Sequence, residues 1–223
     1  MKFSITGFGH LREYLLHRPQ AVVSATCTAR QHQKLPTDVR ALVRIGATAG
    51  AEIQLTPLRE NELDAALHSG KLQTLVALDH ISDPRNLGAV VRAAAFFGIE
   101  GVIIADRRQA QLTATVVATA HGGLACVNLY VVKNISRVLA KLKGFDFWVI
   151  GADVRGEPLQ FCDFSKKVYL FGSEDKGISP LLRGHCDCLF RIPSSGGKAI
   201  ESLNIASAAA VMLFWGTNAG GSS

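Results

Sequence analysis

Three loops, far apart in the chain, combine polar side chains with glycines beside apolar segments. They are Asp83-Pro84-Arg85-Asn86-Leu87-Gly88-Ala89-Val90-Val91-Arg92, then Leu170-Phe171-Gly172-Ser173-Glu174-Asp175-Lys176-Gly177-Ile178-Ser179, and the segment from Ile192-Pro193 to Glu201-Ser202-Leu203-Asn204-Ile205-Ala206. Open α/β sheets bind ligands where polar loops follow the strand ends. Three such loops therefore predict one composite site.

In the first loop, Asn86 and Arg92 are the candidates for chemistry. Asp83 followed by Pro84 is typical of a helix start, because Asp caps and proline suits the first turn, so these two residues need no catalytic role. Arg92 lies in an otherwise apolar helix, where a cation must extend to water or find an anionic partner. Phosphate binding or catalysis is the functional interpretation of Arg92.

The second and third loops offer one acid and two small polar residues. Gly172 and Gly177 permit close approach of the backbone to a ligand, and Glu174 lies in the turn between them. A lone turn carboxylate is more often solvated. Ser202 and Asn204 precede a very apolar helix that either of them could cap, yet two polar residues are more than one cap requires.

The elements that position these loops follow an alternating pattern. Apolar runs at 75–78, 102–105, 127–132, 147–151, 168–171 and 188–192 predict strands, and 87–97, 112–120, 135–142 and 202–215 predict helices, with another helix after residue 180. Continuous apolar strands separated by helices indicate an α/β fold with a parallel sheet covered on both faces. We predict this domain over residues 73–217 and a disordered tail at 218–223.

Residues 1–72 read as a separate small α/β domain, with a joint near 71–74. The chain carries a formal net charge of +6, and residues 1–46 hold seven Lys and Arg against two acids, which is +5. Such a cluster suits contact with phosphates, although solvated helix faces would also explain it. The charge pattern alone leaves both interpretations of this domain open.

Several classes of protein are disfavoured. No Gly-x-Gly-x-x-Gly follows the first strand of the alternating region, and no Walker-type Gly-Lys-Ser/Thr occurs. The five cysteines lack zinc-site spacing, so we expect free thiols and no metal. No apolar run reaches the ~18 residues of a membrane span, and the first residues lack a secretory apolar core. A soluble cytoplasmic protein is therefore expected.

Taken in order, the three loops closely resemble the three motifs of the SpoU (TrmH-like) RNA ribose 2'-O-methyltransferases of the SPOUT superfamily. The resemblance implies S-adenosylmethionine as cofactor and RNA as substrate, with ribosomal RNA as the expected class. It also implies a trefoil knot near the C-terminal end of the catalytic domain and a homodimer formed through the knotted region. Residues 1–70 are similar to the L30e-type RNA-binding domain of family members that act on ribosomal RNA.

The resemblance assigns residues by position. It gives a catalytic site of Asn86, Arg92, Glu174, Ser202 and Asn204. A guanidinium has a pKa of about 12.5 or above, so we expect Arg92 to anchor phosphate and position the hydroxyl rather than act as a literal base. The other four residues would order that arginine and the nucleotide.

The resemblance also gives cofactor contacts through backbone groups at Gly172, Ile192 and Leu203, and we add Phe171 and Gly177 to this predicted set. One departure from the family is an insertion of about two residues, Gly197-Lys198, in the third loop. We expect that insertion to bulge outward and leave cofactor binding intact, because the entropy of a loop changes slowly with its length.

Two other functions remain open. The first is a non-catalytic RNA-binding relative whose altered third loop no longer holds the cofactor, and the second is a methyltransferase that acts on transfer RNA. A generic nucleotide-binding α/β protein is disfavoured by the missing glycine fingerprint. Titration with S-adenosylmethionine separates the enzyme from a silent relative.

Overall fold

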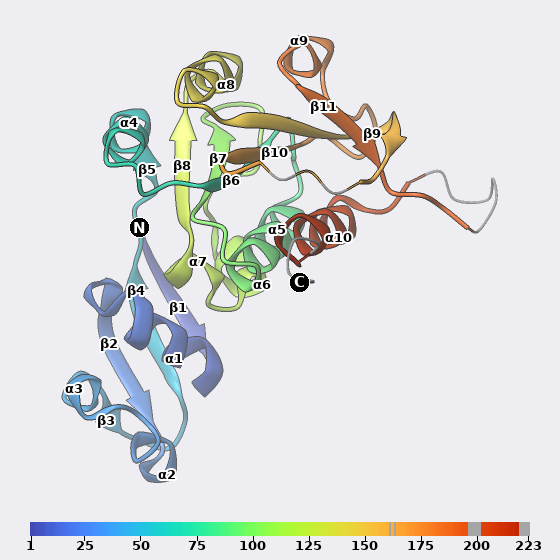
Figure 1. Cartoon of the computed structure of the whole chain (residues 1–223). Coiled ribbons are helices and arrows are strands. Elements are labelled where there is room, and N and C mark those ends of the chain that lie inside the picture. Colours follow the sequence, from blue (N-terminus) through green and yellow to red (C-terminus); the bar gives the residue numbers. More distant parts are fainter. Residues whose placement is uncertain (161, 163, 196–201, 219–223) are drawn as a thin grey trace.

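The computed structural model describes residues 1–160, 162, 164–195 and 202–218, which form two β-sheets flanked by helices (Figure 1). The smaller sheet has the strand order β1-β4-β2-β3. Its strands are β1 (Lys2–Thr6), β2 (Val22–Cys27), β3 (Arg44–Ile45) and β4 (Gly50–Gln54). Its helical segments are α1 (Phe8–His17), η1 (Pro19–Ala21), α2 (Ala29–His32) and α3 (Thr37–Arg40).

The larger sheet has the order β11-β9-β10-β6-β7-β8-β5, and neighbouring strands pair in parallel throughout. Its strands are β5 (Leu58–Arg59), β6 (Thr74–Leu78), β7 (Gly101–Ala105), β8 (Asn128–Val132), β9 (Trp148–Pro158), β10 (Lys167–Phe171) and β11 (Cys188–Arg191). The predicted parallel α/β fold is confirmed.

Helices cover both faces of this sheet, because alternate side chains of each strand point to opposite faces. Val76 and Leu78 belong to one apolar core, while Leu75 and Ala77 belong to another. The first core includes side chains from α5 (Pro84–Phe96), α6 (Ala114–Ala120), α7 (Gly123–Cys126) and α10 (Ile205–Asn218). The second includes side chains from α4 (Glu60–His68), α8 (Ile135–Lys143) and α9 (Pro180–Arg183).

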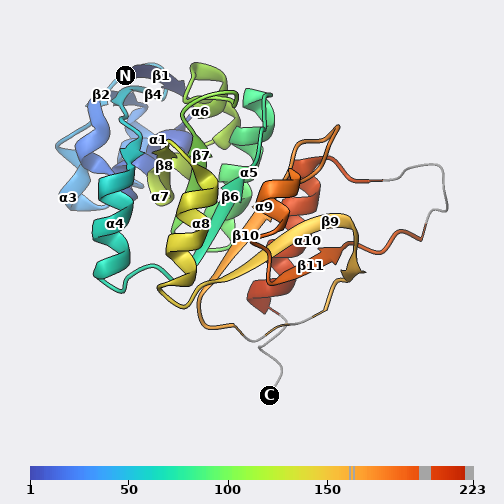
Figure 2. The same ribbon diagram turned by 90° about the horizontal axis from the view of Figure 1, so that it is seen from above.

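The chain passes from one sheet to the other between Gln54 and Leu58, ahead of the joint that the sequence pattern predicts at 71–74. The reason is that β5 pairs with β8 and α4 packs on the same strand, so both elements extend the larger sheet. The smaller sheet lies against the larger part of the molecule where β1 meets α6 and α1 meets α7 (Figures 1 and 2).

The C-terminal helix α10 packs along α5 and ends at Asn218, so its last residue falls within the tail predicted at 218–223. Residues 219–223 lie outside the described part of the chain. Among the described helices, none combines the length and the apolar character that crossing a membrane requires.

Candidate active site

Four parallel strands, β6, β7, β8 and β10, end at the same edge of the larger sheet, where the loops that follow them surround two neighbouring cavities. The first cavity has a volume of about 460 Å³ and the second about 260 Å³. Both are lined by Asp79, His80, Arg108 and Ser179, so they adjoin one another. This is the position at which parallel α/β sheets bind ligands.

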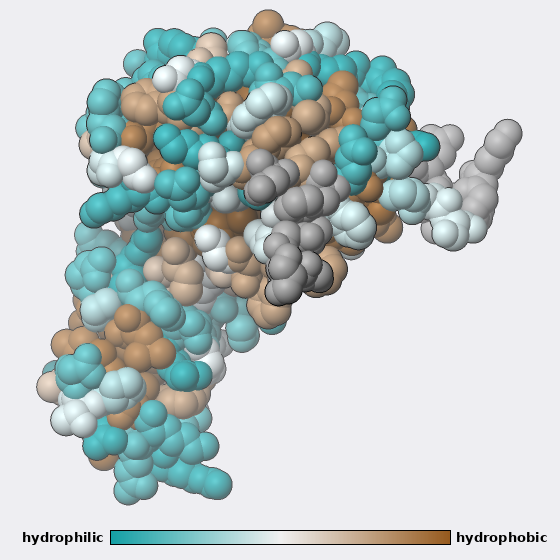
Figure 3. Space-filling view, viewed as in Figure 1, coloured by the Kyte–Doolittle hydropathy of each residue, from teal (hydrophilic) through white to brown (hydrophobic). Residues whose placement is uncertain are grey.

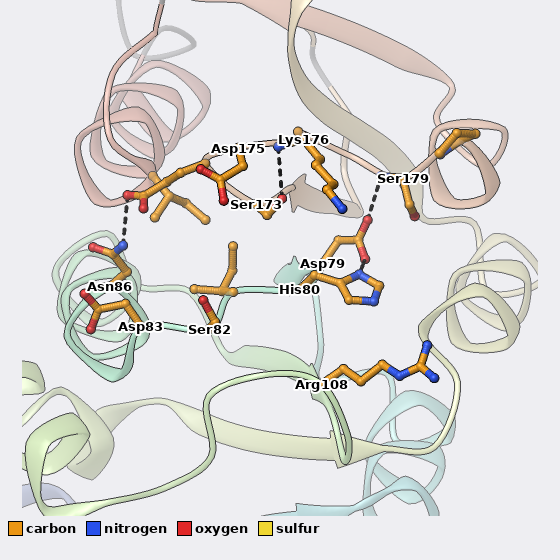
Figure 4. A pocket seen from close by; sticks show the side chains of 15 residues that line it. Asp79, His80, Ser82, Asp83, Asn86, Arg108, Ser173, Asp175, Lys176 and Ser179 are labelled. Carbon is orange, nitrogen blue, oxygen red and sulfur yellow. Dashed lines mark hydrogen bonds and ion pairs between the residues drawn. The ribbon is translucent and has the colours of Figure 1, made fainter.

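The first cavity joins two of the loops that the sequence singles out. Asn86, in the first turn of α5, donates a hydrogen bond from Nδ2 to Oε1 of Glu174 at 2.9 Å, and both residues line the cavity (Figure 4). Gly177 and Ile205 also line it, so the first residue of α10 reaches the same space. Parts of all three loops therefore meet at one cavity.

The turn that carries Glu174 depends on two glycines. Ser173 and Gly177 exchange backbone hydrogen bonds of 3.1 and 2.8 Å, which closes the turn, and Gly177 has a φ of 65°. A Cβ on Gly172 would lie 2.0 Å from the carbonyl carbon of Gly177 and 2.1 Å from the nitrogen of Ile178. Only glycine fits at position 172 without moving the backbone, which accounts for the glycine-rich sequence here.

Arg92 lies apart from this cavity. Arg92 follows Asn86 by six positions on α5, which places the two side chains about 120° apart around the helix. Its side chain is exposed, it lines neither cavity, and no described residue makes a hydrogen bond or ion pair with it. Within one chain the structure therefore does not bring Arg92 together with Asn86 and Glu174.

Asn204 is the N-cap of α10. Its Oδ1 accepts a hydrogen bond from the backbone N–H of Ser207 and its carbonyl oxygen accepts one from Ala208, both at 2.9 Å. The sequence left capping open as an interpretation, and the geometry supports that role for Asn204. Ser202 and Leu203 are exposed just before it. None of these three residues lines the two cavities.

Two further predicted cofactor contacts, Phe171 and Ile192, lie at the ends of β10 and β11. The side chain of Phe171 is buried in the core beneath the site, and its carbonyl oxygen accepts the backbone N–H of Asp79 at 2.8 Å. Ile192 is half-buried against the same core. The insertion at Gly197-Lys198 lies outside the described residues.

The sequence interpretation missed the pair Asp79 and His80, which directly follow β6. Asp79 is buried, its Oδ1 bonds Nδ1 of His80 at 2.5 Å, and its Oδ2 accepts the backbone N–H of Ser179 at 2.7 Å. One carboxylate thus joins the ends of β6 and the loop after β10. An acid that directly follows an apolar strand was the available signal, since a buried carboxylate needs such partners.

Comparisons with known proteins bear on this site. Residues 73–214 of this chain match a family profile described as "SpoU rRNA Methylase family". The 23S rRNA (guanosine-2'-O-)-methyltransferase RlmB of Acinetobacter baylyi is 40% identical over 161 residues, covering 70% of this chain and 64% of that protein. An uncharacterized tRNA/rRNA methyltransferase of Mycoplasma genitalium is 34% identical over 164 residues, covering 72% of this chain and 66% of that protein. This chain spans less than two thirds of the length of either relative.

Solved structures share the fold. The SpoU methyltransferase AviRb from Streptomyces viridochromogenes, in complex with AdoMet, superposes with a TM-score of 0.70 at 20% identity, covering 96% of this chain and 88% of that one. A structure described as a putative RNA methyltransferase of the TrmH family from Porphyromonas gingivalis gives a TM-score of 0.69 at 24% identity, covering 95% and 88%.

Proposed function

The chain belongs to the SpoU rRNA methylase family, and from this premise we propose that it transfers a methyl group from S-adenosylmethionine to a ribose 2'-hydroxyl of RNA. The observation that carries the proposal is the hydrogen bond between Asn86 and Glu174, which joins the first two family-like loops at one cavity. The relative RlmB is named for 2'-O-methylation of 23S rRNA, which supports ribosomal RNA as the substrate class.

The residues around the first cavity fit the cofactor chemically. Asp83, Glu174 and Asp175 line it, and carboxylates complement a positively charged sulfonium. The backbone beside Gly172 leaves no room for a Cβ, as expected of a loop shaped around close backbone approaches. AviRb was solved in complex with AdoMet and has the same fold. We infer that the loop at 171–177, together with Ile192 and Leu203, holds S-adenosylmethionine.

When bound, S-adenosylmethionine supplies an electrophilic methyl group, so the protein mainly has to align the ribose hydroxyl and assist loss of its proton. Asn86 and Glu174 restrain one another and thereby present fixed polar groups to the nucleotide. Arg92 contributes a planar cationic donor for a substrate phosphate, which orients the hydroxyl. Ser202 and Asn204 add polar groups at the start of α10.

Arg92 does not line the first cavity of its own chain, so its proposed role at the site needs an explanation. One turn along α5 from Arg92, Phe96 is 84% exposed, and Val211, Phe214 and Trp215 of α10 are exposed nearby. Apolar surface is visible in this region in Figure 3. A patch of exposed aromatic side chains is typical of a protein interface. We propose that two copies pair through α5 and α10 and that Arg92 serves the partner's site.

The finer features of the fold belong to the same proposal. We propose that the methyltransferase domain, at residues 73–217, has the trefoil knot of the SPOUT superfamily near its C-terminal end. We also propose that residues 1–72, of which β5 and α4 pack on the larger sheet, act as an L30e-like RNA-binding domain ahead of it. Seven basic residues against two acids in the first 46 positions support an RNA-binding role. We also propose that the protein acts in the cytoplasm.

The test is methylation of RNA with labelled S-adenosylmethionine, with ribosomal RNA, transfer RNA and DNA as parallel substrates. Alkaline hydrolysis then locates the label, because a methylated 2'-oxygen cannot attack the neighbouring phosphate. We expect label in alkali-stable dinucleotides from ribosomal RNA and none in DNA. Label on mononucleotide bases would contradict ribose methylation, label in transfer RNA alone would change the substrate class, and failure to bind S-adenosylmethionine would favour a non-catalytic relative.

A further inference from the structure

The second cavity, of about 260 Å³, lies largely outside the family-like loops. It is formed by the segments that follow β7 and β8, together with Leu181 and Leu182 of α9, and it meets the first cavity at Asp79, His80, Arg108 and Ser179. The two cavities therefore form one groove along the carboxyl edge of the sheet. A ligand that occupies both must be extended.

Basic side chains surround this second cavity. Arg107, Arg108 and Lys133 line it, all three are exposed, and among the described residues none of them has an ion-pair partner. The acids that line it are Asp106 and Asp79. Asp79 is already engaged by His80 and by the backbone N–H of Ser179. The arrangement leaves unneutralised cations that are able to bind an anion.

The backbone holds two of the lining residues in an uncommon conformation. His80 and Arg108 have φ values of 59° and 56°, in the left-handed region that residues other than glycine seldom adopt. Both follow strand ends and both line both cavities. Such backbone strain concentrates at functional sites, where the surrounding structure maintains it. Figure 4 shows both side chains on the opposite side of the first cavity from Asn86.

We propose that this second cavity binds a backbone phosphate of the RNA, next to the nucleotide whose ribose enters the first cavity. The inference rests on the proposed function and names a subsite for the same substrate. Arginine presents planar N–H donors that match phosphate oxygens, and lysine adds a compact positive charge. Because Nδ1 of His80 bonds Asp79, its outer nitrogen Nε2 is left to contact the same nucleotide.

An extended polyanion explains the groove better than a single small anion. The cations belong to two different loops, one after β7 and one after β8, and they continue the groove away from Asn86 and Glu174. Phosphate contacts of this kind fix the register of a nucleic acid without reading its sequence. The subsite would therefore set which ribose reaches the first cavity.

The test uses fluorescence anisotropy of a labelled, short single-stranded oligoribonucleotide of mixed sequence. Arg108→Asn removes the charge and keeps a residue that tolerates the left-handed backbone. We expect its affinity to fall about tenfold, as for loss of a charged hydrogen bond, and the salt dependence to decrease by roughly 0.7 in slope. Lys133→Gln should act in the same direction, and Arg108→Lys should retain part of the affinity.

Arg137→Gln is the matched control. Arg137 lies on α8, pairs with Glu60 at 2.6 Å and lines neither cavity, so its loss removes the same charge from a neighbouring position. We expect its affinity for the oligoribonucleotide to match that of the unmodified protein. An equal loss in Arg137→Gln and Arg108→Asn would mean that overall charge alone matters, and would overturn the subsite.

An oligonucleotide of the same sequence with a neutral methylphosphonate backbone identifies the contacted group. The unmodified protein and Arg108→Asn should bind this neutral chain equally. If Arg108→Asn weakens both chains to the same extent, or weakens neither, the phosphate subsite is wrong. Because these measurements need no methyl transfer, a protein that binds through Arg108 but methylates no RNA would contradict the proposed function and leave the subsite standing.

Discussion

Asn86 and Glu174 are 88 positions apart in the chain, yet the amide Nδ2 of one lies 2.9 Å from the carboxylate Oε1 of the other. Asn86 belongs to the first turn of α5, and Glu174 to the turn that follows β10. The hydrogen bond therefore ties two strand-end loops together above β6 and β10, which are neighbours in the sheet.

Asn86→Ala and Glu174→Ala should each reduce methyl transfer at least 100-fold while leaving the fold intact. Neither side chain is buried, so the loss of unfolding free energy should stay near or below about 1 kcal/mol. The double variant should be little worse than either single one, because residues that act as a unit are not additive. Initial rates and thermal unfolding provide the measurements.

Glu157→Ala serves as the control for that pair, because Glu157 is an exposed acid on β9 that lines neither cavity. Its activity should remain normal. Additive losses in the double variant would show that Asn86 and Glu174 act independently.

Arg92→Ala and Glu174→Ala, each inactive alone, should regain activity when both chains are co-expressed and purified as mixed dimers. If Arg92 serves the partner's site, one of the two sites in a mixed dimer keeps both residues and the other loses both. If Arg92 and Glu174 of the same chain act together, every site is defective. Activity in dimers isolated by two different affinity tags distinguishes these arrangements, and inactivity of the mixed dimers would contradict the shared site.

Gly172→Ala should destabilise the turn and abolish cofactor binding. The new Cβ would lie 2.0 Å from the carbonyl carbon of Gly177, so the backbone has to shift, at a cost of about 1–3 kcal/mol. Gly184→Ala is the control, since a Cβ there would lie 3.4 Å from the carbonyl oxygen of Leu181, an ordinary contact. Calorimetric titration with S-adenosylmethionine and thermal unfolding measure both effects. Normal binding by Gly172→Ala would show that the turn relaxes freely.

Stability should fall as the pH decreases from about 6.5 to about 4, because of His10. Burial, with a smaller contribution from His121, lowers the pKa of His10 from 6.5 to about 4. In that window the unfolded chain binds a proton that the folded chain excludes. The free energy of unfolding therefore decreases by about 3 kcal/mol at most. His10 Nε2 has no hydrogen-bond partner among the described atoms, which agrees with a neutral buried ring.

His10→Gln should flatten this part of the pH profile, measured by denaturant unfolding at successive pH values. His68→Gln, a change at an exposed histidine of α4, should leave the profile as it is. An unchanged slope in His10→Gln would assign the acid sensitivity to other groups.

The sequence by itself determined the fold class and the edge of the sheet at which the polar loops gather. Runs such as Leu75–Leu78 and Val102–Ala105 are apolar at every position, which only strands buried on both faces require, and the intervening helical segments make the sheet parallel. Polar residues directly after such strands must gather at one edge of the sheet. The helix cap at Asp83, whose side chain accepts the N–H of Arg85, also followed from local residue types.

The tertiary structure decided which of these residues meet. The distance from Asn86 to Glu174 depends on the adjacency of β6 and β10, which no local pattern encodes, and the same adjacency gives Asp79 its bond to Ser179. The rotation of α5 turned Arg92 outward, and the pairing of β5 with β8 assigned residues 58–68 to the larger sheet. Local propensity depends on neighbouring residues in the chain, whereas strand order and helix rotation depend on how distant apolar surfaces are buried together, and only the folded chain fixes that.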